Sequence, residues 1–162
     1  MGGHAEYEST LQWRERLLGP EHPDTRAALD NVARAHLALG QPTQALETAK
    51  RAYEAQRATL PTGDADLLSS IRLIADIHRQ AGEHGEEIAW RRRLLDELDA
   101  SDEFAARENV ESSLRLLTLL GSPDSGEDAT TVLEVIEKQL EQGGEELDSL
   151  RADYRRLTDQ SS

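Results

Sequence analysis

The sequence contains no cysteine, one phenylalanine, two tryptophans and three tyrosines. Without cysteine the chain can form no disulfide, thiolate zinc site or cysteine nucleophile, which fits a reducing compartment. Its longest strongly apolar stretch, residues 114–120, is much too short to cross a bilayer. The N-terminus also lacks the basic-then-apolar order of a secretion signal. We therefore expect a soluble, cytoplasmic protein with no membrane partner.

Positive charge is also scarce. Eighteen lysines and arginines face 32 aspartates and glutamates, for a net charge of −14 at pH 7. Lys50 and Lys138 are the only lysines, and this arginine bias together with abundant alanine is typical of a GC-rich bacterial genome. Such an acidic chain neutralises phosphate poorly. Nucleic acid and anionic membranes are therefore poor candidates for its main partner.

A repeat is the clearest pattern in the chain, which best matches itself when Gly40 is aligned with Gly82. Apolar exchanges such as Val32/Ile74 keep the register of the identities. The identical pairs are Leu18/Leu60, Asp24/Asp66, Ala33/Ala75, His36/His78, Gly40/Gly82 and Arg51/Arg93. Because only 37% of the residues are hydrophobic, we expect a modest, aliphatic core that depends on this pattern.

Each repeat unit reads as two helices, because its apolar residues recur at helical spacing. Gly40 and Gly82 are expected to end the first helix of each unit in the left-handed conformation. Small residues let two helix backbones approach closely. Those at the expected contacts are Ala33, Ala49, Ala52, Ala75 and Ala89. We predict an all-α fold of antiparallel hairpins with about seven helices and no strand.

The predicted organisation is a single helical repeat domain over residues 1–162. Its parts are a half-repeat helix at 4–18, repeat 1 at 19–59, repeat 2 at 60–101, a degenerate repeat 3 at 102–142 and a C-terminal capping helix at 145–159. Gly121 aligns with Gly82 only at a shorter offset than Gly82 with Gly40, so the register degrades in the third unit. The packing of residues 122–162 is therefore left open.

Two helices per unit, a glycine at each hairpin and the linker LGPEHPDT at 18–25 resemble the tetratricopeptide repeat family. The resemblance is to its 42-residue variety, found in kinesin light chains and many bacterial proteins. Residues 11–18 resemble the end of a second helix, while the linker at 60–66 keeps only the leucine and one aspartate. The resemblance implies a right-handed solenoid whose first helices line a concave groove that binds an extended peptide or a helix. Fold alone does not establish that function.

Helical geometry places a set of mostly polar side chains on the inner face of the first helices. These positions are Ala27, Asp30, Arg34, Leu37, Ser69, Arg72, Asp76, Arg79, Glu108, Glu111, Arg115 and Thr118. Arginines there can clamp carboxylates bidentately, and the acids between them favour basic groups. The candidate partner-binding residues are Asp30, Asn31, Arg34, Arg72, Asp76, Arg79, Glu111 and Arg115. They indicate a mixed-charge peptide as the ligand.

For this predicted groove a simpler reading stays open. Pairs such as Arg34/Asp30 and Arg115/Glu111 are one helical turn apart and can merely support solvated helix faces. The family resemblance implies that Asn31 hydrogen-bonds the backbone of a bound peptide. An ordinary solvent-exposed asparagine is the alternative at this position.

The histidines and tryptophans are read as packing residues. His36 and His78 share one repeat position, and no further ligands accompany them at metal-binding spacing. Trp13 and Trp90 lie on second helices, where we expect them to fill gaps between hairpins. The sequence carries no phosphate-binding loop, nucleophile elbow or metalloprotease motif. We therefore expect no enzyme activity, no cofactor and no metal.

The charge is polarised along the chain. Residues 18–59 hold five acids and five bases, whereas residues 102–162 hold 15 acids and 6 bases, a net charge of −9. The leading hypothesis is a non-catalytic adaptor that binds a peptide or helix of a partner protein. Two alternatives remain open: a ligand-sensing regulatory domain of a larger bacterial signalling or transcriptional regulator, and a scaffold that self-associates through the ends of its array.

Overall fold

The computed structural model describes residues 3–98, 107–121 and 127–159, and within them it is all-α, with no strand. The helices are α1 (Gly3–Leu18), α2 (Pro23–Ala38), α3 (Pro42–Thr59), α4 (Ala65–Ala81), α5 (His84–Leu98), α6 (Arg107–Leu120), α7 (Glu127–Gln142), a short 3-10 helix (Glu145–Leu147) and α8 (Asp148–Asp159). The described residues thus hold eight α-helices where about seven were expected. A half-repeat helix, three pairs and a final helix account for all eight.

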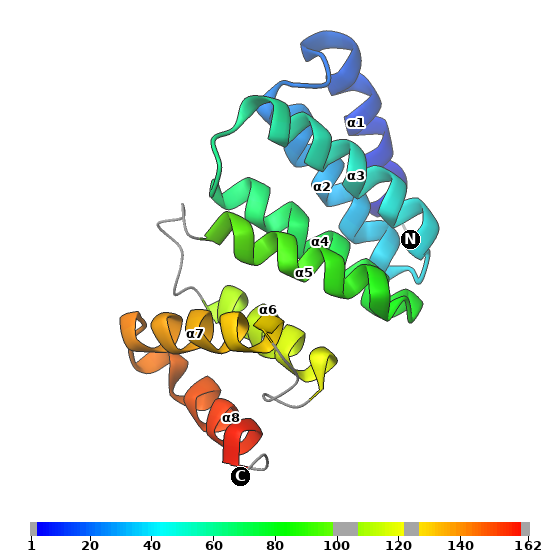
Figure 1. Ribbon diagram of the computed structural model, residues 1–162. Helices are drawn as coiled ribbons and strands as arrows, with labels where there is room; N and C mark the ends of the chain where they lie inside the picture. The colour runs from blue at the N-terminus through cyan, green and yellow to red at the C-terminus, as the bar shows by residue number, and fades with distance from the viewer. Residues whose placement is uncertain (1–2, 99–106, 122–126, 160–162) are drawn as a thin grey trace. The chain divides into compact units, whose positions relative to one another are not determined.

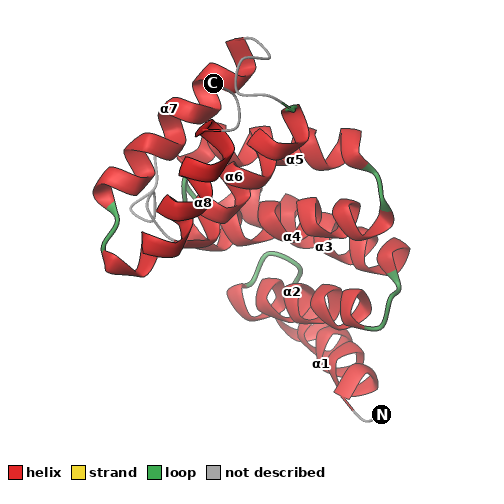
Figure 2. Ribbon diagram, turned by 90° about the horizontal axis from the view of Figure 1, so that it is seen from below, coloured by secondary structure: helices red, strands yellow, loops and turns green. Residues whose placement is uncertain are grey.

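The chain divides into two compact units, unit 1 at Met1–Trp90 and unit 2 at Arg91–Ser162, with the boundary inside α5. No helix in the described part of the chain is both long and apolar enough to cross a membrane. Figure 2 shows green loops between the successive helices from α1 to α5. The predicted repeat boundaries, and their grouping into one domain, stay predictions, and the expected start of repeat 3 at residue 102 lies outside the described residues.

Unit 1 is built around an antiparallel hairpin of α2 and α3, with α1 packed along α2 and α4 packed along α3 (Figure 1). Ala33, Ala49 and Ala52 are fully buried, so small side chains stand where the helices meet, as expected. Ala75 is also buried, but Ala89 is exposed and fills no such contact. The largest buried side chains around the hairpin are aliphatic, together with Tyr53.

Burial follows the repeat registers. When Gly40 is aligned with Gly82, every buried position of α2 falls on a buried position of α4. The α2 positions are Thr25, Arg26, Ala28, Leu29, Val32, Ala33 and His36. When Gly82 is aligned with Gly121, every buried position of α6 likewise falls on a buried position of α4. Those α6 positions are Asn109, Val110, Ser112, Ser113, Leu114, Leu116 and Leu117. The first helices thus bury one common face despite their different sequences.

Gly40 and Gly82 end α2 and α4 with φ values of +69° and +75°, in the left-handed region expected for them. Gly121 follows α6 with φ +91°. No atom lies within 4 Å of a Cβ built on any of these glycines, so backbone conformation and not crowding explains their presence.

The two repeat histidines are buried, as the packing interpretation expects, and they also close the turn that follows each helix. His36 Nδ1 shares a hydrogen bond with the Gln41 side chain at 2.8 Å, and His78 Nδ1 donates to Glu83 over 2.6 Å. The backbone N–H of Gln41 or Glu83 donates in turn to the carbonyl of its histidine at 2.9 Å. Each histidine therefore binds the residue just beyond the turn twice, across the intervening glycine.

Equivalent residues also cap the starts of α2 and α4. The His22 ring nitrogen accepts from the Asp24 N–H at 3.2 Å, and Pro23 begins α2. In the next unit Asp64, which occupies the repeat position of His22, accepts from the Asp66 N–H at 2.9 Å. The second linker has lost the HPDT sequence, yet a carboxylate satisfies the same N-terminal donor.

The two tryptophans lie in different environments. Trp90 is half-buried and meets Tyr53 edge to face, with ring centroids 5.1 Å apart and an interplanar angle of 87°. The expectation that Trp13 fills a gap between hairpins is wrong, because its side chain is 61% exposed. Trp13 lies on the side of α1 that has no neighbouring helix in unit 1. Leu39, which follows α2, is exposed as well.

In unit 2, α6 packs against α7, and α8 lies against α6. Arg151 ties the start of α8 to the end of α7 with four hydrogen bonds. Its guanidinium donates to the carbonyls of Leu140, Gly143 and Gly144 at 2.6, 2.7 and 2.9 Å, and to the Asp148 carboxylate at 2.6 Å. Arg107 of α6 adds hydrogen bonds to the Glu146 carbonyl at 3.0 Å and to Ser149 Oγ at 3.2 Å, so two arginines hold the connection between α7 and α8.

Candidate functional site

Asp30 on α2 is a predicted binding residue of unit 1 that contacts two further helices. It accepts hydrogen bonds from Ser70 Oγ on α4 at 3.0 Å and from Gln56 Nε2 on α3 at 3.3 Å. Both carboxylate oxygens are therefore engaged within the unit. Asp30 joins three helices, which explains why a charged residue is kept at this half-buried position.

Burial raises the pKa of Asp30 above its ordinary value of 3.8. The hydrogen bond from Ser70, the charge of Arg34 and the hydrogen bond from Gln56 oppose this rise, while the charge of Asp66 adds to it. Because burial dominates, the ionised carboxylate is less stable in the folded chain than in water. The cluster around Asp30 is therefore sensitive to the protonation of one group.

Other predicted residues of unit 1 lie along the exposed side of α2 and α4. Arg34 is exposed and donates to Ser69 Oγ on α4 at 2.9 Å, while Asn31 is exposed on α2. Arg79 pairs with Asp76 at 3.6 Å on α4, and Arg72 is half-buried on the same helix. The structure thus connects Arg34 to an inner position of the next first helix, Ser69.

In unit 2 three of the four predicted inner positions of α6, all except Glu108, line a pocket of about 460 Å³ together with α8. The α6 side contributes Glu111, Leu114, Arg115 and Thr118, and the α8 side contributes Leu150, Asp153, Arg156 and Leu157. Three leucines provide apolar surface, and two arginines and two acids lie among them. An apolar pocket with a few charged groups is the usual form of a recognition site.

The charged groups at this α6/α8 pocket pair mainly with near neighbours on the helix surface. Glu111 accepts from Arg107 Nε at 2.8 Å, and Arg156 donates to Asp153 at 3.0 Å. These side chains are roughly half exposed or more, and exposed pairs of this kind contribute about 1 kcal/mol or less. Exchanging such a contact for one with a bound charged group costs little.

The sequence does not predict the α8 wall of this pocket, because residues 145–159 are expected only to form a capping helix. Leu150 and Leu157 are two helical turns apart, so they share a helix face with Asp153 and Arg156. That spacing is the signal for a face that combines apolar and charged groups. It was not tied to α6 because the repeat register ends before α8.

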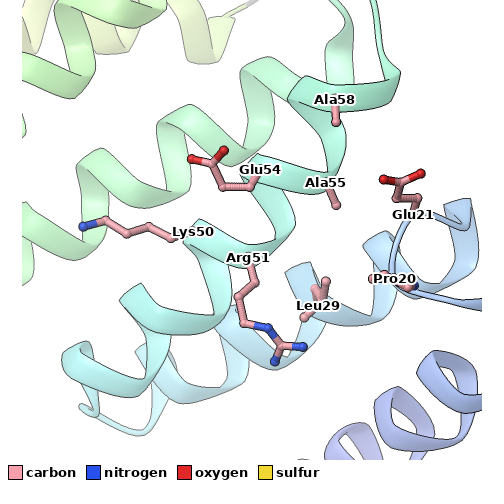
Figure 3. Close-up of a pocket in the computed structure, with 8 residues that line it drawn as sticks. All are labelled: Pro20, Glu21, Leu29, Lys50, Arg51, Glu54, Ala55 and Ala58. Carbon is pink, nitrogen blue, oxygen red and sulfur yellow. The ribbon is translucent and has the colours of Figure 1, made fainter.

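A second pocket of about 480 Å³ lies in unit 1 between the α1–α2 connection and α3. Figure 3 shows Ala55 of α3 facing Pro20 and Glu21 of that connection, while Lys50 and Arg51 point in different directions. Arg51 forms an ion pair with Glu15 of α1, which occupies its guanidinium. None of the eight predicted partner-binding residues lines this pocket.

Among the described residues, no group of three histidines, aspartates or glutamates is arranged to hold a metal ion. His36 and His78 instead form hydrogen bonds with Gln41 and Glu83, which follow the turns. Glu8 lies 3.7 Å from His36 Nε2, on the side opposite Gln41. Each histidine is thus explained by the helix ends that it stabilises.

Comparison with known proteins agrees with this architecture. Residues 5–58 match the tetratricopeptide repeat family. Two solved structures of nearly identical tetratricopeptide-like repeats, assigned to a kinesin light chain of Podospora anserina, have TM-scores of 0.64 and 0.63 to this chain. Each is 20% identical to it. The matches cover 82% and 83% of this chain, and they span 63% and 64% of those chains.

No curated protein matches the sequence of the chain. The structural matches establish a fold, and the matched residues contain both the LGPEHPDT linker and the α2–α3 hairpin. Repeats of this kind serve as protein-binding scaffolds, because stacked helix pairs create extended surfaces. Residues 5–58 are thus similar to the tetratricopeptide repeat family, and most of the length of the chain shares the fold of kinesin-light-chain-like repeats.

Proposed function

We propose that the chain is a non-catalytic adaptor that binds a peptide or helix of a partner protein at the α6/α8 pocket. The observation that carries this proposal is that predicted inner positions of α6 line the α6/α8 pocket. Glu111, Arg115 and Thr118 were placed on the binding face by helical geometry, and all three line the pocket. The first-helix face of unit 1, with Arg34 and Asn31 exposed, is a second contact surface for the same class of ligand.

The chemistry of the pocket defines the ligand. Leu114, Leu150 and Leu157 offer apolar surface to one buried side chain of the partner. Arg115 and Arg156 can each bind a carboxylate with two parallel hydrogen bonds. Glu111 and Asp153 favour basic groups beside them. The proposed ligand is therefore a segment with an apolar anchor flanked by charges of both signs.

A displayed library of random peptides, selected on the immobilised full chain, tests this proposal. We expect the selected peptides to combine an apolar residue with flanking acids and bases. In titration calorimetry, R115E/R156E should weaken binding roughly tenfold to a hundredfold, because a hydrogen bond to a charged group is worth about 1.5–3 kcal/mol.

R155E is the matched control, because Arg155 is exposed on α8 but does not line this pocket. It matches the R156E half of the double variant in the size of the charge change and in the helix that carries it. A parallel R34E variant measures the contribution of the unit 1 face. Equal weakening of peptide binding by R155E and R115E/R156E would show that net charge alone causes the effect, which contradicts a specific pocket. Failure to select any peptide would contradict the proposal as well.

A further inference from the structure

The outer face of α1, formed by Tyr7, Trp13, Leu17 and Leu18, carries an unusual amount of exposed apolar surface. These side chains are 47%, 61%, 61% and 40% exposed. Among the described residues they are four of the five large exposed hydrophobics, and the fifth is Leu39. Soluble proteins seldom expose such clusters without a partner. At the edge of this face, buried Leu11 anchors α1 to α2.

The four side chains form a stripe along one side of the helix, and Glu6, Thr10 and Arg14 lie among them. At about 100° of rotation per residue, the four apolar side chains fall within an arc of roughly 140° on the helix. Leu11 lies just outside this arc, toward α2. The stripe runs over nearly the whole of α1, which begins at Gly3 and ends at Leu18. It is therefore long enough to meet a second helix along its length.

We infer that the outer face of α1 is a self-association surface, on which the α1 helices of two copies of this chain pack antiparallel. Antiparallel packing makes the stripe complementary to itself, as a two-fold interface requires. Tyr7 of one copy then lies opposite Leu17 of the other, and the two Trp13 side chains lie close to the two-fold axis. A parallel pair would stack each residue on its own copy.

The charges of α1 favour the antiparallel arrangement. Glu6 lies near the start of the helix and Arg14 and Arg16 lie near its end, whereas Glu8 lies on the α2 side, beside His36. The remaining acid, Glu15, is neutralised by its ion pair with Arg51 of the same molecule. Antiparallel packing brings the acidic end of one α1 to the basic end of the other, whereas parallel packing would set like charges together.

Sedimentation equilibrium of the full chain over a range of concentrations tests this inference. The wild type should move with concentration from 18.0 kDa toward twice that mass. W13E/L17E should remain monomeric, with the dissociation constant raised roughly tenfold or more, because burying unpaired carboxylates opposes association. A wild type that stays monomeric at every concentration overturns the proposal.

Leu39→Glu is the matched control for that variant. Leu39 is nearly as exposed as Trp13 but follows α2 and lies outside the stripe. It should self-associate like the wild type. A dimer that survives W13E/L17E, or one that L39E disrupts equally, would exclude the outer face of α1 as the interface. Circular dichroism of each variant confirms that its helices are retained.

A charge exchange tests the antiparallel arrangement. Glu6 and Arg16 are chosen because Glu8 lies near His36, and Arg14 donates to the Asp24 carbonyl within its own chain. E6R and R16E should each self-associate less than the wild type, because each places like charges at both ends of the pair. Mixed in equal amounts, they should form a one-to-one dimer.

A mixture of E6R and R16E that stays monomeric while the wild type dimerises would overturn the antiparallel arrangement. The pocket variant R115E/R156E should show the same apparent mass as the wild type at each concentration, because it alters neither α1 nor its charges. Loss of peptide binding and loss of self-association are thus measured on separate variants.

Discussion

The two compact units close their helix ends with different chemistry. In unit 1 the same contact occurs twice, from His36 to Gln41 and from His78 to Glu83. In unit 2 the position equivalent to His78, with Gly121 aligned on Gly82, is Leu117, which is buried and apolar. The last connection of unit 2 relies instead on Arg151, which donates to three backbone carbonyls.

This difference matters because a contact that recurs leaves a period in the sequence, and a contact made once does not. The histidines were visible as an identical pair in the register that aligns Gly40 with Gly82. Arg151 stood out in no comparison of the chain with itself, although it makes more hydrogen bonds than either histidine in the contacts described above. Unit 2 thus depends more on individual residues than unit 1 does.

The largest expected effect comes from removing the single-residue contact of unit 2. Arg151→Met keeps much of the aliphatic stem but removes four hydrogen bonds, three of them to backbone carbonyls at the end of α7. We expect the free energy of unfolding to fall by about 2–3 kcal/mol. Urea denaturation followed by circular dichroism measures it.

Arg155→Met is the control for this change, because Arg155 is an exposed arginine on the same helix. Its loss should alter stability by less than about 0.5 kcal/mol. Arg151→Lys should recover only part of the loss, since an ammonium group cannot reproduce the two-sided fork of a guanidinium. Equal effects of R151M and R155M would show that the α7–α8 connection is held by other contacts.

A smaller effect is expected when a unit 1 turn is given the unit 2 residue. His78→Leu removes the hydrogen bond to Glu83, and it also removes the buried Nε2, which has no hydrogen-bond partner. These changes oppose each other, so we expect a net loss of about 1 kcal/mol. Amide hydrogen exchange should locate the loss at the Glu83 N–H, which donates to the residue 78 carbonyl. Unchanged protection there would mean that Gly82 alone sets the turn.

The smallest expected effect at neutral pH concerns the buried carboxylate. Asp30→Asn removes a charge whose burial is unfavourable, but it weakens the contacts with Ser70 and Gln56. These terms nearly cancel, so the free energy of unfolding should change by less than about 1 kcal/mol at pH 7.

The pH dependence is the sharper measurement at Asp30. Its pKa is raised in the folded chain, so above pH 3.8 the unfolded chain loses the proton first. The contribution of Asp30 is therefore fully present at lower pH and declines as pH rises through the folded pKa. The melting temperature of the wild type minus that of D30N should therefore increase as the pH falls toward 3.8. A difference in melting temperature between the wild type and D30N that stays constant from pH 3 to 7 would contradict this.

Much of the fold could be predicted because burial and turn chemistry repeat with the sequence. The alignment of Gly40 with Gly82 predicts which face of α4 is buried from that of α2, and both glycines adopt the expected conformation. Trp13 shows the limit of the argument. Its size suggested burial, but burial of a residue on α1 depends on whether a further helix covers that side.

The candidate site, too, could be predicted only where the repeat register applies. Glu111 and Arg115 could be placed on the α6 face because Gly121 fixes where that helix ends. Their partners on α8 could not be placed, because no repeat relates α8 to an earlier helix. The role of Asp30 was hidden for another reason: helical geometry assigns a face, but it does not reveal that Ser70 and Gln56 converge on one carboxylate.

The edge-to-face contact of Trp90 with Tyr53 makes the two tryptophans separate optical reporters. Trp13 is largely in water and should emit at long wavelength, whereas Trp90 senses an aromatic neighbour that is itself almost wholly buried. A chain with phenylalanine at position 13 would report on α3–α5 packing alone, and one with phenylalanine at position 90 would report on the outer face of α1. The fluorescence of this chain thus follows two separate events in one unit without any added label.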